Sequence, residues 1–239
     1  MSKLTEKKCR LRDRQICLYN QFTFHLSPFT FHLSCPSMTD HYLEIATTDP
    51  VKQLQERWGS RSAYSRLESG PISHQELGSE EIAFIQAQDS FFLASLNEKG
   101  WPYVQHRGGP PGFLQVLSDQ KLGFPDFKGN RQYLSFGNIL TNPRVSLFLI
   151  DYPLRARLKI FGHATLVEGD DLPEPLRQTY PGTGDVQRGM IIQVEAYDWN
   201  CPKYIVPRYT EAQVRHVIDP LVKRISELEG ELARISTKP

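Results

Sequence analysis

Short apolar runs separated by turn residues occupy the middle of the chain. Continuous or alternating apolar patterns predict strands at residues 90–96, 101–106, 112–117, 121–127, 144–151, 155–168 and 188–199. The turn at residues 97–100 ends in Gly100 and predicts a hairpin between the first two strands. Short strands joined by tight turns, without crossover helices between them, favour a closed or nearly closed barrel over a parallel α/β fold.

Helical patterns precede and interrupt these strands. Thr48, Asp49 and Pro50 have the sequence of a helix cap and first turn, a shorter helix is expected at residues 62–67, and a third is expected to begin at Ser79. A further helix is predicted to begin at Asn130, after the strand at residues 121–127. The fold class is therefore mainly β, an α+β barrel with flanking helices.

The last thirty residues have apolar positions spaced alternately four and three apart. These positions are Val214, Ile218, Leu221, Ile225, Leu228, Leu232 and Ile235. This run of about three heptads places mainly β-branched residues at a and mainly Leu at d, which favours a two-stranded coiled coil and hence a homodimer. A single amphipathic helix lying on the barrel would show the same stripe.

The first 37 residues differ from the rest of the chain. They contain a tandem repeat, FTFHLSP followed by FTFHLS, and six Lys or Arg against two Asp or Glu. They lack the uninterrupted apolar region of a secretory signal, and they match a mitochondrial transit peptide in composition only. We predict that residues 1–37 are a non-native or disordered extension and that the protein starts at Met38. The remaining divisions are N-terminal helices (38–79), the barrel (80–209) and the heptad helix (210–239).

Charge, apolar run length and the spacing of His and Cys residues argue against several classes of function. Without residues 1–37 the chain has 22 basic and 25 acidic residues, so no basic excess remains for binding nucleic acid. No apolar run approaches the roughly 18 residues of a membrane span, which predicts a soluble protein. A lone cysteine in the main body, Cys201, fits the reducing cytoplasm. The seven histidines and four cysteines form no Cys-x-x-Cys or His-x-x-x-His pair, so no metal site is expected. Cys201 is either a reactive thiol or, as we prefer, a buried inert one.

A basic corner lies between the strand at residues 121–127 and the helix expected after it. It contains Lys128, Gly129, Asn130 and Arg131, and a glycine, a helix N-terminus and two cations together attract a phosphate group. The same residues also fit an ordinary Asn cap with a solvated Lys and Arg. The neighbouring motifs favour the phosphate interpretation.

Three motifs and one basic strand carry a family resemblance. Residues 106–113 read HRGGPPGF, residues 127–133 read FKGNRQY, residues 155–162 form the basic strand, and residues 198–202 read DWNCP. In this order the segments resemble the FMN-binding split barrel of the pyridoxamine 5′-phosphate oxidase family, over residues 80–206. From the residues alone, the glycines of the first motif favour a shaped turn over a phosphate loop, because its two prolines lack amide donors.

The resemblance implies FMN as the cofactor and a flavin site shared between two subunits. By this resemblance an arginine reaches the phosphate, the basic corner surrounds it, and the later strands face the flavin ring or a substrate pocket. The implied cofactor-binding residues are Arg107, Phe124, Pro125, Lys128, Asn130, Arg131, Gln132, Arg157, Lys159, Trp199 and Asn200. The basic strand also fits a solvated face, and Trp199 also fits ordinary core packing.

The function implied is an FMN-dependent oxidoreductase acting on a small molecule, with NAD(P)H as a candidate electron donor. The vitamin B6 enzyme of the family carries an Arg-x-His near its C-terminus, and residues 198–203 differ from it, so pyridoxamine phosphate is not expected as the substrate. No side chain is assigned as a catalytic acid or base. Two alternatives stay open: a non-catalytic flavin-binding module for storage or sensing, and a protein that handles haem or another tetrapyrrole.

Overall fold

The structure is a computed structural model that describes residues 39–68, 72–73, 75–127, 131–178 and 186–236. The predicted N-terminal extension with its repeat lies outside these residues. So do Lys128, Gly129 and Asn130 of the basic corner, whose predicted roles therefore stay predictions.

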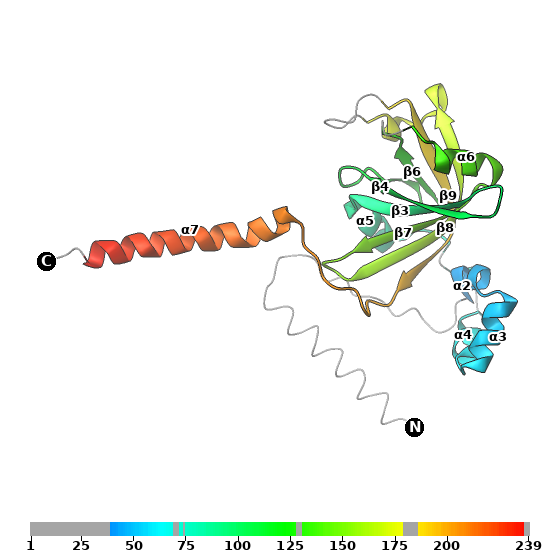
Figure 1. The fold of residues 1–239 in the computed structure, drawn as a ribbon, viewed down its shortest axis with the longest axis horizontal. Coiled ribbons are helices and arrows are strands. Elements are labelled where there is room, and N and C mark those ends of the chain that lie inside the picture. The colour runs from blue at the N-terminus through cyan, green and yellow to red at the C-terminus, as the bar shows by residue number, and fades with distance from the viewer. Residues whose placement is uncertain (1–38, 69–71, 74, 128–130, 179–185, 237–239) are drawn as a thin grey trace. The chain divides into compact units, whose positions relative to one another are not determined.

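A seven-stranded antiparallel sheet forms the centre of the fold (Figure 1). Its strands are β3 (Ser90–Leu96), β4 (Pro102–Gly108), β5 (Gln115–Ser118), β6 (Lys121–Pro125), β7 (Arg144–Asp151), β8 (Ala156–Glu168) and β9 (Arg188–Asn200). The order across the sheet is β4-β3-β7-β8-β9-β6-β5, so β4 and β5 are its edges and the ladder of hydrogen bonds is not closed. The predicted fold class, an antiparallel barrel-like sheet with flanking helices, is confirmed.

Alternating side chains give the sheet an inner and an outer face. In β8, Leu158 and Ile160 are fully buried in the core, while Arg157 and Lys159 between them are only partly buried. Successive residues of a strand point to opposite faces, and residues directly paired across strands share a face. The core therefore fills the inner face, and the register decides on which face each candidate residue lies.

The N-terminal helices agree with the sequence prediction. They are α3 (Asp49–Arg57), which Thr48 precedes and which has Pro50 in its first turn, α4 (Arg61–Leu67) and α5 (Ser79–Ala87). The structure adds five short elements that the sequence patterns did not reveal. These are helix α2 (His41–Ala46), the paired strands β1 (Thr39–Asp40) and β2 (Ile72–Ser73), and the 3₁₀ turns η1 (Gly169–Asp171) and η2 (Glu174–Arg177).

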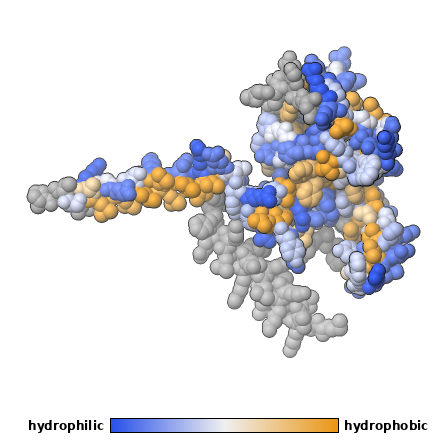
Figure 2. Space-filling view, in the orientation of Figure 1, coloured by the Kyte–Doolittle hydropathy of each residue, from blue (hydrophilic) through white to orange (hydrophobic). Residues whose placement is uncertain are grey.

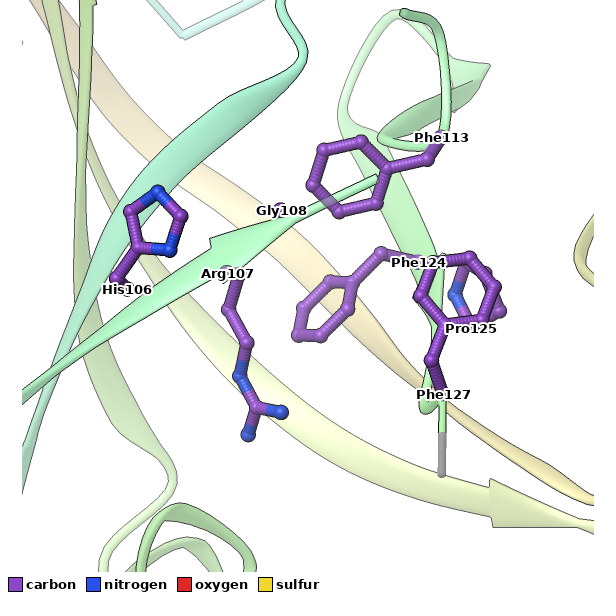
Figure 3. A pocket seen from close by; sticks show the side chains of 7 residues that line it. All are labelled: His106, Arg107, Gly108, Phe113, Phe124, Pro125 and Phe127. Atoms are coloured by element: carbon purple, nitrogen blue, oxygen red, sulfur yellow. The ribbon is translucent and has the colours of Figure 1, made fainter. Parts of the chain in front are cut away.

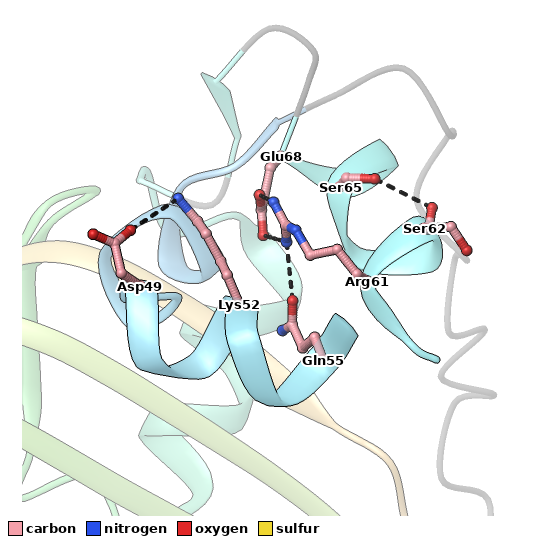
Figure 4. A network of polar contacts seen from close by, with 7 residues as sticks. All are labelled: Asp49, Lys52, Gln55, Arg61, Ser62, Ser65 and Glu68. Carbon is pink, nitrogen blue, oxygen red and sulfur yellow. Dashed lines mark hydrogen bonds and ion pairs between the residues drawn. The ribbon is translucent and has the colours of Figure 1, made fainter. Parts of the chain in front are cut away.

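Polar side chains join α3 to α4 (Figure 4). Arg61 donates two hydrogen bonds to the carboxylate of Glu68, at 2.7 and 2.5 Å, and a third to the side-chain oxygen of Gln55 at 2.9 Å. These hydrogen bonds from Arg61 lower the pKa of Glu68. The small helical unit thus contains an Arg–carboxylate pair with matched, two-point geometry.

The helix predicted to begin at Asn130 begins four residues later. Helix α6 spans Leu134–Thr141 and contacts β3, β4 and β8. Arg131 and Tyr133 have φ values of +59° and +53°, and a right-handed helix cannot include residues in this left-handed region. Arg131 and Gln132 therefore belong to the exposed segment before the helix, rather than to its first turn.

The predicted C-terminal helix is present as α7 (Glu211–Ser236), with Pro220 in its interior. Every side chain described in α7 is exposed. Figure 2 shows apolar residues along one side of this helix and polar residues along the other. No described helix combines the length and apolarity needed to cross a lipid bilayer.

Candidate functional site

A pocket of about 220 Å³ opens where β4 and β6 come together (Figure 3). Aromatic side chains, backbone atoms and one guanidinium group form its wall. The lining residues are His106, Arg107, Gly108, Phe113, Phe124, Pro125 and Phe127. Arg107, Phe124 and Pro125 are among the residues that the resemblance implied for binding FMN, and the fold brings these three together.

Arg107 is the cation of this pocket. Its side chain is only 15% exposed, and its guanidinium carbon lies 5.5 Å from the ring centroids of both Phe124 and Phe136. The Nη1 atom donates to Asp126 Oδ1 at 3.3 Å. The buried Nε has no hydrogen-bond partner among the described residues. Burial lowers the pKa of Arg107, but a guanidinium stays charged in proteins, so the pocket keeps a cation with an unused donor.

Asp126 connects Arg107 to a second arginine. Arg188 of β9 lies 3.9 Å from Asp126 on one side and 3.9 Å from Glu168 on the other. Burial raises the pKa of Asp126, although the charges of Arg107 and Arg188 oppose this shift. The Arg188 guanidinium also lies 5.3 Å from the centroid of the Tyr133 ring, beside the segment that contains Arg131.

Sequence reasoning missed Asp126, Arg188 and Phe136. Asp126 had a local signal, because it is the one charged residue in the apolar stretch 122–127. Arg188 and Phe136 had none, because the pairing of β6 with β9 and the packing of α6 bring them to the pocket.

The glycines of the HRGGPPGF motif shape the backbone beside the pocket. Gly109 N–H donates to the carbonyl of Asp89 at 2.9 Å, and Gly112 N–H donates to Gln88 at 3.2 Å. A Cβ atom on Gly109 would lie 2.6 Å from Phe113 Cγ, and Gly112 has a φ of +83° that favours glycine. These amides serve the fold and are not free for a phosphate, which confirms the predicted shaped turn.

Arg157 and Lys159 lie on β8 with partners inside the chain. Arg157 Nη2 donates to the backbone carbonyl of Cys201 at 2.5 Å. Lys159 Nζ lies 2.6 Å from Asp198 Oδ2 and 4.5 Å from the centroid of the Tyr42 ring, which belongs to α2. Each of these two side chains therefore has a partner within the chain. Arg155, by contrast, is an exposed turn residue with a φ of +54°.

The register separates these cations from Arg107. Lys159 pairs with Phe148, Phe148 with Phe92, and Phe92 with His106, which makes one row on the outer face. Arg107 pairs instead with the buried Phe91 on the inner face. Figure 3 shows His106 and Arg107 leaving β4 in different directions. Neither Arg157 nor Lys159 is among the described residues that line the Arg107 pocket within one chain.

The DWNCP motif lies at the end of β9, where its tryptophan makes packing contacts. The Trp199 ring packs edge-on against Phe84 at 4.7 Å, and its indole N–H donates to Glu81 at 2.7 Å, which ties α5 to the sheet. Of the two interpretations of Trp199, these contacts favour core packing. Asn200 pairs with Arg157 in the sheet. Cys201 is exposed because the chain leaves the sheet after Asn200, so our preference for a buried thiol is wrong.

The pocket lies within the segment that matches a known family. The model of the pyridoxamine 5′-phosphate oxidase family matches residues 79–193, from α5 into β9. Over this segment, just under half of the chain, the barrel is similar to the pyridoxamine 5′-phosphate oxidase family. All seven residues that line the pocket, together with Asp126 and Arg188, fall inside this family segment.

No curated protein matches the chain, but several solved structures do. HupZ of Group A Streptococcus is 15% identical, and the match covers 56% of this chain and 99% of HupZ with a TM-score of 0.44. A Clostridium acetobutylicum protein related to general stress protein 26 is 14% identical over 51% and 85% of the two chains, with a TM-score of 0.38. An F420 reductase is 19% identical over 48% and 94%, with a TM-score of 0.34.

Other polar side chains in or next to residues 79–193 lie outside this pocket. His163 Nδ1 lies 3.8 Å from Glu195, on an exposed part of β8 and β9. Among the residues described, no three His, Cys, Asp or Glu side chains are arranged to hold a metal ion. The Arg107 pocket is thus our candidate site, because a buried cation with an unpartnered donor lines it.

Proposed function

We propose that this chain is an FMN-binding oxidoreductase whose Arg107 pocket takes the phosphate end of the cofactor. The observation that carries the proposal is the Arg107 side chain itself, which is buried between two phenyl rings with its Nε atom unpartnered among the described residues. A buried donor without a partner is costly, and a charge-assisted hydrogen bond to a phosphate would remove that cost.

The residues present fit a phosphate group with an aromatic neighbour. Arg107 offers a planar cation, Arg188 a second one behind Asp126, and Phe113, Phe124 and Phe127 offer apolar walls. Arg131 lies in the exposed segment before α6, and its charge would add to phosphate binding. Bound FMN supplies redox chemistry through its isoalloxazine ring, and the chain supplies binding and orientation.

The size of the pocket supports a site completed by a second chain. Sites for drug-sized ligands generally occupy about 300–1,000 Å³, and this pocket has about 220 Å³. It therefore suits the phosphate end of FMN better than the whole molecule. Arg157 and Lys159, on the outer face, would meet the same cofactor only from another copy. These two observations support a homodimer in which each flavin contacts both chains.

The pocket supplies no acid–base pair of its own. Its described lining contains one histidine and no serine, cysteine or carboxylate, and the His106 ring contacts Phe92 at a centroid distance of 5.6 Å. A reaction that depends on the cofactor for its chemistry fits this lining. Together with the family resemblance, we propose a small molecule as the substrate, NAD(P)H as the electron donor and the cytoplasm as the location.

The test is the absorption spectrum of the purified protein, followed by anaerobic addition of NADH or NADPH. A yellow protein with flavin bands, bleached within seconds, is the expected result. Flavin bands that no reduced nicotinamide bleaches would instead support a storage or sensing module. A Soret band would point to haem or another tetrapyrrole. A colourless protein that does not bind added FMN would overturn the proposal.

A further inference from the structure

Helix α7 carries an apolar stripe that nothing described in this chain covers. Ile218, Leu221, Ile225, Leu228 and Leu232 are all exposed, with Leu232 at 65%. A helix of this composition gains most of its stability from packing its apolar face, not from intrinsic propensity. We propose that α7 pairs in parallel with α7 of a second copy, as a two-stranded coiled coil.

The residues of the stripe fit the two seam positions of such a pair. Ile218 and Ile225 occupy a, and Leu221 and Leu228 occupy d. In parallel coiled coils, β-branched residues at a with Leu at d select two strands over three or four. This distribution makes a second copy of the same helix the occupant of the stripe.

Pro220 does not interrupt this seam. It occupies position c, and the carbonyl that its missing N–H would have bonded belongs to His216, at position f. Positions c and f face away from the partner helix in a two-stranded coil. The proline therefore alters the solvent side of α7 and leaves the apolar side continuous.

The residues that flank the seam distinguish a parallel pair from an antiparallel one. In a parallel pair each g residue faces the next e residue of the partner. Val217 would then face Val222 of the second copy, and Arg224 would face Glu229. In an antiparallel pair with the same a–d contacts, Val222 would face Glu229 and Arg224 would face Glu231. Only the parallel arrangement matches apolar with apolar and basic with acidic at both positions.

Parallel pairing has a consequence for the barrels. Both copies of α7 begin at Glu211, so a parallel coil holds the two preceding barrels at the same end. Such tethering raises the effective concentration of one barrel near the other. It would favour the shared site proposed above, but the coiled coil itself rests only on α7 and does not require flavin.

Cysteine cross-linking in the full-length chain tests the pairing directly. With the four native cysteines replaced by Ser, Leu221→Cys introduces a thiol at d, and Ser226→Cys introduces one at the outward position b. Under mild oxidation of the flavin-free protein, we expect Leu221→Cys to form a disulfide-linked dimer and Ser226→Cys to stay unlinked. Equal cross-linking of both variants, or of neither, would overturn the proposal.

Charge variants supply a second test. Ile225→Asp should raise the dimer dissociation constant by at least about 30-fold, because it buries unpaired carboxylates in the seam. Ser226→Asp adds the same charge one residue away and should leave that constant unchanged. Arg224→Glu should weaken the dimer, and Glu229→Arg in the same chain should restore it. Rescue by Glu231→Arg instead would indicate an antiparallel pair and overturn the proposal. These readouts do not depend on FMN, so they stay informative if no flavin binds.

Discussion

Two arginine–carboxylate pairs in this protein have opposite properties. Arg61 and Glu68, whose side chains are 23% and 16% exposed, meet through two short hydrogen bonds, and this contact lowers the pKa of Glu68. Arg107 and Asp126 meet through one contact of 3.3 Å, with both side chains 15% exposed, and burial raises the pKa of Asp126. The first pair is geometrically complete, whereas the second leaves donors unused in a less polar environment.

Under the proposed function, this difference separates a structural contact, Arg61–Glu68, from a ligand-binding pair, Arg107–Asp126. Each carboxylate oxygen of Glu68 accepts from Arg61, which joins the two ends of α4 and needs nothing further. Arg107 keeps an unpartnered buried Nε, and Asp126 divides its charge between Arg107 and Arg188. A buried ion pair with poor geometry does not repay its desolvation cost, so it is weak as a stabilising device. It becomes useful when an anion supplies the missing contacts.

The largest expected effect is that of Arg107→Met on FMN binding. Methionine keeps the apolar contacts with Phe124 and Phe136 but removes the charge and all donors. Loss of two charge-assisted hydrogen bonds, about 1.5–3 kcal/mol each, should weaken FMN by about 100-fold or more. Flavin fluorescence titration measures this change.

Riboflavin, which lacks the phosphate, is the control ligand for Arg107→Met. It should bind the wild type and the variant about equally, provided that circular dichroism shows both to be folded. If FMN affinity is unchanged, the phosphate does not bind at Arg107. If FMN and riboflavin weaken together, the variant has damaged the pocket.

A smaller effect is expected for Arg131→Ala. Arg131 is exposed before α6, so one contact to the phosphate is worth less there than in the buried pocket, and a loss of about 10-fold is expected. Arg155→Ala is a matched control, because Arg155 is also an exposed arginine with a positive φ, of +54° against +59°. Equal FMN dissociation constants for the two variants would mean that Arg131 does not contact the phosphate.

Much of this fold was predictable because its signals are local. The bounds predicted for β3 and β7 agree with the structure to the residue, since alternation and flanking turns are properties of contiguous sequence. The start of α6 was not predictable, because Arg131 and Tyr133 adopt left-handed backbone without glycine. Helix α2 was missed because its six residues are too few for a clear periodic pattern.

The candidate site was predictable only in part, for the same reason. Arg107, Phe124 and Pro125 lie in or beside motifs, so sequence resemblance reached them. The ion pair between Asp126 and Arg188 depends on the pairing of β6 with β9, which no local sequence pattern specifies. The separation of Arg107 from Lys159 onto opposite faces likewise follows from the register across β4, β3, β7 and β8.

A moderate, pH-dependent effect is expected for Asp126→Asn. The folded-state pKa of Asp126 is raised, so its contribution to stability is complete below the unfolded pKa of about 3.9 and is lost as the pH rises through the folded pKa. Asparagine does not titrate. The unfolding free energy of Asp126→Asn minus that of the wild type should therefore increase from pH 3 to pH 7, as urea titrations would measure. A constant difference would mean that Asp126 is not desolvated.

The smallest effect, and one of opposite sign, is expected for Glu68→Gln. The folded-state pKa of Glu68 is lowered, so its contribution is present above the unfolded pKa of about 4.3 and is lost as the pH falls through the folded pKa. The variant should be less stable than the wild type at pH 7, and the difference should shrink toward pH 3. Dissolved ions screen the attraction between Arg61 and Glu68, so added salt should also reduce the difference at pH 7. If the two carboxylate variants followed the same pH trend, the contrast between the fully hydrogen-bonded pair and the incomplete pair would be wrong.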